Sequence, residues 1–202
     1  QKLEIEVVDA KTDKPINAAV TVEGMIFDST VVCKGKSRYA FMMDPYRNLH
    51  INCLSKGYMF YNTKVKGSSD STVTVQARLM PIATDEQVVL EDIRFVGNAE
   101  QVLRSSQGSL FLLLRFLEEN PTTKVEIQGH VNGPTYKKNI KEFVELSTAR
   151  ARTVYNFLLI NDVDPSRISY VGLGNSHMLY PDPKSKAESE ANRRVEVRIT
   201  HT

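Results

Sequence analysis

The sequence predicts two domains, an all-β sandwich followed by an α/β domain whose helices pack on a small mixed sheet. The first 81 residues contain only short strand-like runs separated by turn formers. From about residue 82 onward, runs with strand spacing alternate with runs of helical spacing. A chain of 202 residues is long enough for two small domains. We therefore place one domain at residues 1–81 and a second at residues 82–202.

Strand signals fill the first domain. In "KLEIEVVDA", the apolar residues Leu3, Ile5 and Val7 alternate with polar ones and share one face. Further runs rich in β-branched and aromatic residues are "AAVTVEG", "RYAFMM", "NLHINCL" and "TVTVQARL". The turn-forming stretches "KTDKP", "KGKS", "DPYRN" and "KGSSDS" separate most of these runs. Such closely spaced strands without a helix indicate an antiparallel sandwich.

The second domain has the predicted order β-α-β-α-β-β. The first helical run contains Leu103, Leu110, Leu114 and Leu117 at helical spacing, and the pair Asn120-Pro121 ends it. Pro134 opens the second helical region, which extends to about Ile160. The predicted elements are a strand at 88–95, a helix at 99–120, a strand at 123–130, a helix at 134–160, and strands at 168–174 and 193–200.

Composition excludes several classes of function. The net charge is +2, from 26 basic and 24 acidic residues, and no Lys/Arg-rich run follows a phosphate backbone, so we expect no nucleic-acid partner. Cys33 and Cys53 are either one disulfide or two small buried thiols. Neither cysteine has the companions at ligand spacing that a metal site needs, so we expect no metal and no cofactor.

One charged residue interrupts the apolar stripe of the second predicted helix. Phe143, Leu146, Arg150, Val154 and Phe157 follow at spacings that place them on one helix face. A guanidinium does not lose its proton, and leaving it buried and unpaired costs roughly 3–5 kcal/mol. A carboxylate, backbone carbonyls at strand ends or a ligand anion must therefore meet Arg150.

Two other interpretations of Arg150 stay open on periodicity alone. Its side chain can leave the edge of the stripe for water, or it can pair within the protein with Glu126, Glu145 or Glu196. The stretch "GHVNG" ends the strand before this helix, and ligands of open α/β sheets collect at such strand ends. We expect Asn132 of this loop to face Arg150, which suits a ligand with a carboxylate and further polar groups.

Four separated motifs resemble those of the OmpA-like C-terminal domain. They are "VEIQGH", "LSTARARTVYNFLL", "DPSRISYVGLGNS" and "ANRRVEVRI", in that order, and the resemblance covers about residues 88–200. It implies a module that binds the diaminopimelate part of the peptidoglycan stem peptide without breaking a bond. It also implies an anchor in the periplasm, associated with the outer membrane of a Gram-negative cell.

The resemblance assigns roles to individual residues. In "LSTARA", Arg150 matches the arginine that holds a ligand carboxylate. The family usually has "GHTD", whose aspartate meets the ligand ammonium, whereas here Asn132 stands in "GHVN", so the ion pair is lost and we expect weaker or altered recognition. His130 is a ligand candidate or a strand-end histidine held by backbone. Asn98 is a rim candidate, and Arg194 is the candidate from the pair "RR", of which at most one side chain can approach the site.

The first domain resembles the carboxypeptidase-regulatory-like domain, a small transthyretin-like sandwich. The stretches that carry this resemblance are "VVDAKTDKPINAAVTV", "SRYAFMM" and "LSKGYMFYNTKV". It implies a spacer or docking module without catalysis, so a protein partner through the sandwich is expected.

No nucleophile, base and orienting group can be assembled, so we expect no enzyme, and a wall-cleaving amidase is the weakest interpretation. The leading hypothesis is a peptidoglycan-binding anchor. The alternative is a structural scaffold of the envelope whose OmpA-like cleft has degenerated.

Overall fold

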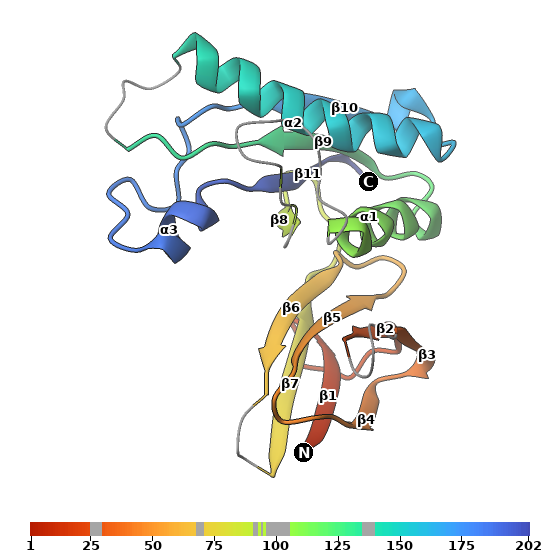
Figure 1. The fold of residues 1–202 in the computed structure, drawn as a ribbon. Coiled ribbons are helices and arrows are strands. Elements are labelled where there is room, and N and C mark those ends of the chain that lie inside the picture. The colour runs from red at the N-terminus through yellow and green to blue at the C-terminus, as the bar shows by residue number, and fades with distance from the viewer. Residues whose placement is uncertain (25–29, 68–70, 91–92, 94, 96–105, 135–139) are drawn as a thin grey trace. The chain divides into compact units, whose positions relative to one another are not determined.

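A computed structural model describes residues 1–24, 30–67, 71–90, 93, 95, 106–134 and 140–202 of the chain. The chain divides into two compact units, Gln1–Ile82 and Ala83–Thr202. Figure 1 labels the helices and strands of both units. Among the described residues, no helix combines the length and the apolar composition needed to cross a membrane.

The first unit consists of two β-sheets. One sheet has the strand order β4-β1-β7 and the other the order β3-β2-β5-β6. The strands are β1 (Lys2–Asp9), β2 (Ala18–Glu23), β3 (Thr30–Lys36), β4 (Arg38–Met42), β5 (Asn48–Leu54), β6 (Tyr61–Lys66) and β7 (Thr72–Leu79). The predicted all-β composition of this half is confirmed for the described residues.

One detail of the predicted antiparallel arrangement is wrong. Strand β1 pairs antiparallel with β4 but parallel with β7, with Leu3 opposite Val73 and Val7 opposite Ala77, so this sheet is mixed. Strand β7 follows β5 and β6 of the other sheet, and it pairs with the edge of β1 that β4 leaves open, in the same direction as β1. Sequence spacing reports the presence of a strand but not the neighbour it pairs with, which is why the parallel pair was missed.

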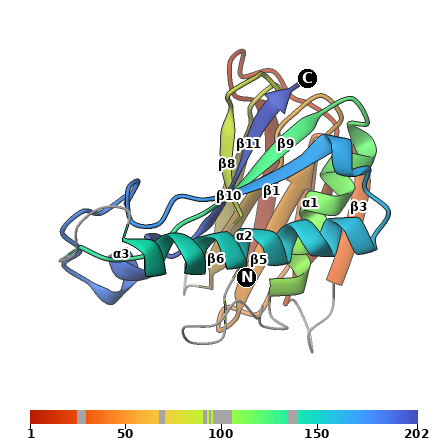
Figure 2. The ribbon, with the colours of Figure 1, turned by 90° about the horizontal axis from the view of Figure 1, so that it is seen from above.

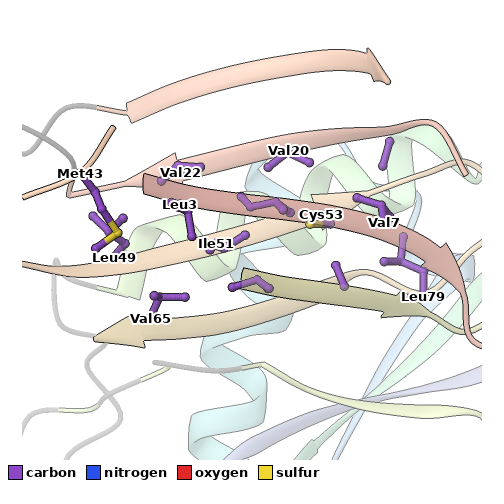
Figure 3. Packing of buried hydrophobic residues seen from close by; sticks show 14 residues of the cluster. Leu3, Val7, Val20, Val22, Met43, Leu49, Ile51, Cys53, Val65 and Leu79 are labelled. Atoms are coloured by element: carbon purple, nitrogen blue, oxygen red, sulfur yellow. The ribbon is translucent and has the colours of Figure 1, made fainter. Parts of the chain in front are cut away.

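Alternating apolar residues from both sheets fill one core. Leu3, Ile5 and Val7 of β1 are at most 1% exposed, as the alternation in "KLEIEVVDA" predicts. They pack with Val20, Leu49, Ile51, Cys53 and Leu79 from the neighbouring strands (Figure 3). Both sheets therefore bury their inner faces against each other.

The two cysteines are free, and the register explains why. Cys33 of β3 and Cys53 of β5 both lie opposite Val20, on the two sides of β2. Two strand spacings separate them by roughly 9–10 Å, whereas a disulfide requires Cα atoms within about 7 Å. Of the two alternatives in the sequence, the unbridged thiols are the one observed.

The second unit has a four-stranded mixed sheet with the order β10-β9-β11-β8. Its elements are β8 (Gln87–Leu90), α1 (Gln107–Glu119), β9 (Lys124–Gly129), α2 (Lys141–Ile160), β10 (Ile168–Gly172), α3 (Lys186–Ala191) and β11 (Val195–His201), with a short 3-10 turn at Pro165–Arg167. Strands β9 and β10 are parallel, and β11 is antiparallel to both β9 and β8. The predicted order of strands and helices is confirmed, with α3 as an addition.

Helix α2 lies across β9 and β10, as Figure 2 shows. It contacts α1 through Phe157, whose ring meets that of Phe111 edge-on at 5.4 Å between centroids. Helix α1 begins at Gln107 and α2 at Lys141, later than the expected starts. Residues 96–105 and 135–139, which include Leu103, lie outside the described residues.

Candidate functional site

Two glycines let helix α2 approach the sheet closely. A Cβ on Gly129, at the end of β9, would lie 2.1 Å from the backbone oxygen of Ser147. A Cβ on Gly172, at the end of β10, would lie 2.2 Å from Thr148 Oγ1. The hydroxyl of the fully buried Ser147 accepts a hydrogen bond of 3.0 Å from the backbone N–H of Gly174. These contacts fix the helix on the sheet less than one turn before Arg150.

The buried face of α2 differs from the predicted stripe. The buried residues are Ser147, Arg150, Ala151, Val154 and Leu158, whereas Phe143, Leu146 and Phe157 are only partly buried. The small residues Ser147 and Ala151 face the glycine-containing strands, so the helix turns its small side inward. The inward position of Arg150 is confirmed, since its exposure is only 5%.

The guanidinium of Arg150 lies over an aromatic ring. Its central carbon is 4.8 Å from the ring centroid of Phe95, a cation–π contact. Burial lowers the pKa of Arg150, and the positive charge of the exposed Arg193 lowers it further. Arg150 nevertheless stays charged at any physiological pH. The site therefore combines a buried cation with a second cation at the surface.

The three carboxylates considered as internal partners of Arg150 have other partners. Glu196 Oε1 accepts from Arg194 Nε at 2.6 Å. Glu126 Oε1 accepts from Gln128 Nε2 at 2.7 Å, and Glu145 Oε1 lies 3.7 Å from Lys141 Nζ. Each of these carboxylates therefore has a partner other than Arg150.

Asn132 is held by a buried amide. Asn192 is fully buried, and its Oδ1 accepts from the backbone N–H of Tyr180 at 2.9 Å. Its Nδ2 donates at 2.8 Å to the Tyr180 carbonyl and at 2.8 Å to Asn132 Oδ1. Asn192 directly precedes Arg193, so consecutive residues connect the Asn132 loop to the charge that acts on Arg150.

The described residues 130–134, which follow β9, make contacts on several sides. The Gly133 carbonyl accepts at 2.9 Å from the side chain of Asn175, which is 1% exposed. The Gly133 N–H points to Met178 Sδ at 3.5 Å, and a Cβ on Gly133 would lie 2.2 Å from the ring of Phe143. The backbone N–H of Val131 donates to the Gly174 carbonyl at 2.9 Å. The two neighbours of Asn132, Val131 and Gly133, are therefore both held by hydrogen bonds.

His130 belongs to a buried charged cluster with Glu196 and Arg194. His130 is 2% exposed, and its Nε2 lies 3.3 Å from Glu196 Oε2. Burial lowers the pKa of His130, and the contact with Glu196 opposes part of this effect. Contact with His130 and Arg194 lowers the pKa of Glu196 to about 2. The Arg194 side chain also donates to the His177 carbonyl at 3.0 Å.

The predicted site residues therefore fall into two groups. Asn132 bonds to Asn192 and Arg150 experiences the charge of the adjacent Arg193, whereas His130 and Arg194 form the buried cluster with Glu196. Asn98 lies outside the described residues. Within the described part of the chain, no group of three His, Cys, Asp or Glu side chains could hold a metal ion.

Sequence reasoning did not select two residues near the site, Asn192 and Arg193. Asn192 stands in the quoted motif "ANRRVEVRI", but its partner Asn132 is 60 positions away, so nothing local marks its role. For the pair "RR", alternation along a strand predicts opposite faces, and the structure gives a buried Arg194 and an exposed Arg193.

The fold and the site define an α/β domain with a buried arginine and a fixed polar loop at one end of a small mixed sheet, an arrangement suited to binding an anionic ligand. The model of the OmpA family matches residues 94–194, which is half of the chain. The chain therefore belongs to the OmpA family.

Relatives share this domain over part of their length. The chain is 34% identical over 121 residues to outer membrane porin F of Pseudomonas fluorescens, a match that covers 59% of this chain and 35% of the relative. It is 30% identical over 133 residues to outer membrane porin F of Pseudomonas aeruginosa, a match that covers 64% of this chain and 36% of the relative. The chain thus spans about a third of the length of these relatives. A solved structure of a MotB-like protein from Desulfovibrio vulgaris is 24% identical, with 57% of this chain and 74% of that chain covered and a TM-score of 0.48.

Proposed function

We propose that this chain binds peptidoglycan through its second unit, without catalysis, and anchors an envelope assembly to the cell wall. The proposed ligand is the diaminopimelate residue of the stem peptide. Membership of the OmpA family and the names of the porin F relatives support this proposal. The observation that carries it is the buried Arg150 on α2, beside the sheet end where the Asn132 loop begins.

A carboxylate is the ligand group that Arg150 suits best. The planar guanidinium offers paired N–H donors that match the two oxygens of a carboxylate. At 5% exposure, little water competes for these donors, so a charge-assisted hydrogen bond contributes about 1.5–3 kcal/mol. Arg193 adds a second positive charge that attracts an anion.

The described residues around the site favour binding over reaction. His130 is the residue at the sheet end most suited to act as a base, but it is 2% exposed and directed at Glu196. Ser147 Oγ donates to the Val144 carbonyl at 3.0 Å and accepts from Gly174, which commits this hydroxyl to structure. Holding the ligand is the activity that this arrangement supports.

The first unit has a different proposed role. A carboxypeptidase-regulatory-like sandwich would act as a spacer or dock a protein partner. The whole protein would then join an outer-membrane or periplasmic assembly to the wall.

The test is co-sedimentation with purified sacculi. The wild-type chain should sediment, and Arg150→Ala should remain in solution, with circular dichroism confirming that both are folded. Arg150→Lys keeps the charge but loses the planar pair of donors, so it should bind with intermediate affinity. Arg152→Ala, an exposed arginine on the same helix, is the matched control and should sediment like the wild type.

One observation favours the alternative of a scaffold with a degenerate site. Arg150 rests on the ring of Phe95, which compensates part of its charge within the protein. If folded wild type does not sediment with sacculi, this alternative is preferred and the anchor function is refuted.

A further inference from the structure

The side-chain amide of the loop residue Asn132 has a defined orientation, and this orientation bears on the ligand group that can meet it. The inference rests on the proposed function and specifies the ligand group that the same site selects. Its basis is the orientation of two side-chain amides, which backbone groups determine.

Asn192 has only one possible orientation. The N–H of Tyr180 must donate and its carbonyl must accept, and they meet Asn192 at 2.9 Å and 2.8 Å. The amide oxygen of Asn192 therefore faces the N–H, and its nitrogen faces the carbonyl. Because Asn192 is fully buried, an inverted amide would place two acceptors together and two donors together without water to separate them.

The orientation of Asn132 follows from that of Asn192. The second hydrogen of Asn192 Nδ2 points to Asn132 at 2.8 Å, so the atom of Asn132 at this position must be its acceptor, Oδ1. The Nδ2 group of Asn132 is then the end of the amide directed away from Asn192. Among the described residues, none accepts a hydrogen bond from Asn132 Nδ2, and the side chain is only half-buried.

The charges around the site agree with a hydrogen-bond donor at Asn132. Arg150 offers only donors, and the exposed Arg193 carries a positive charge that acts on Arg150. An ammonium held close to a carboxylate on Arg150 would be repelled by both arginines and would meet the N–H₂ group of Asn132 instead of an acceptor. A carbonyl oxygen or a second carboxylate at that position would accept from Asn132.

We propose that this site selects a ligand with acceptor groups at both ends, a carboxylate for Arg150 and a carbonyl oxygen for Asn132. In stem-peptide terms, it selects diaminopimelate whose side-chain amine is acylated, as in a cross-link, over diaminopimelate with a free amine. Acylation removes the positive charge and supplies the carbonyl oxygen.

Calorimetry with two probes tests this. One is a stem tripeptide ending in diaminopimelate with a free side-chain amine, and the other is the same peptide acetylated on that amine. Wild type should bind the acetylated peptide about three- to tenfold more tightly, the worth of one hydrogen bond. The side-chain amide resonances of Asn132 should shift in NMR spectra on addition of the acetylated peptide.

Asn132→Asp should reverse the preference. One carboxylate oxygen would accept from Asn192 and the other would face the ligand, so the free amine should bind more tightly than the acetylated peptide. Asn156→Asp is the matched control, because it adds the same charge at an exposed position of α2 and should keep the wild-type preference.

The outcomes separate the two proposals. If wild type sediments with sacculi but prefers the free amine, the donor assignment is overturned and the anchor function stands. If it binds neither peptide and does not sediment, both are overturned. Preference for the acetylated peptide that Asn132→Asp inverts supports the inference.

Discussion

Removing the carboxylate of Glu196 should destabilise the second unit strongly. Glu196 is 8% exposed and lies between Arg194 Nε at 2.6 Å and His130 Nε2 at 3.3 Å. In Glu196→Gln, the guanidinium of Arg194 keeps its bond to the His177 carbonyl but loses its charge partner inside the protein. Breaking a buried ion pair from one side costs roughly 3–5 kcal/mol.

The pKa of Glu196 gives a second measure of this cost. A fall from 4.5 to about 2 on folding corresponds to roughly 3 kcal/mol of stability. Because the folded pKa is the lower one, this contribution is present above pH 4.5 and is lost as the pH falls toward 2. The pKa of His130 is also lowered on folding, so its contribution begins to disappear as the pH falls below 6.5. Acid therefore weakens the cluster through both groups.

Native-state hydrogen exchange is a suitable assay, because the sequence contains no tryptophan and the chain has two units. Peptides from β9 and β11 should lose about 3 kcal/mol of protection at pH 7 in Glu196→Gln. Asp85→Asn is the matched control. It breaks the exposed ion pair between Asp85 and Arg198, which lies on β11 like Glu196, and should cost less than about 1 kcal/mol.

A loss below about 1 kcal/mol in Glu196→Gln would refute this reasoning. A double variant provides an independent check. Replacing both Glu196 and Arg194 by Met removes the two charges together and should be less destabilising than either single replacement. If the double variant is as unstable as the sum of the singles, the cluster does not act as an ion pair.

Two further predictions concern packing. Gly129→Ala should lower the free energy of unfolding of the second unit by more than about 2 kcal/mol, because the new methyl group would meet the Ser147 carbonyl. A loss of protection below about 1 kcal/mol in hydrogen exchange would contradict this. In a native thiol-labelling assay, the half-buried Cys33 should react, whereas Cys53 should react only after unfolding, because burial raises its pKa to about 12. Rapid labelling of both would show that the β3-β2-β5-β6 sheet opens readily.

Arg150 could be identified from the sequence because a charge at an apolar position breaks a local periodic pattern. The other buried residues of α2 could not all be identified in this way. Ser147 and Ala151 are polar or neutral in the sequence, and their burial depends on glycines in two other elements. The partners of Glu196, Glu126 and Glu145 are properties of the folded chain, and the sequence does not reveal them.

The orientation of the Asn132 side chain likewise could not be predicted from the sequence. The sequence places Asn132 after a buried strand, and an amide there is both a donor and an acceptor. Which end faces a ligand depends on Asn192, 60 residues away, and on the backbone of Tyr180. No local pattern carries that information. In the first unit, likewise, β1 could be recognised from its alternation, but its parallel pairing with β7 could not.

The depth of Arg150 has a consequence for how an attachment would respond to ionic strength. Contacts between surface charges weaken at high salt, because counterions screen them over about 8 Å at physiological ionic strength. A carboxylate bound to a guanidinium that is 5% exposed lies where few counterions can enter. Such an attachment would tolerate large changes in the salinity around a cell, whereas the contribution of the exposed Arg193 would vary with the medium.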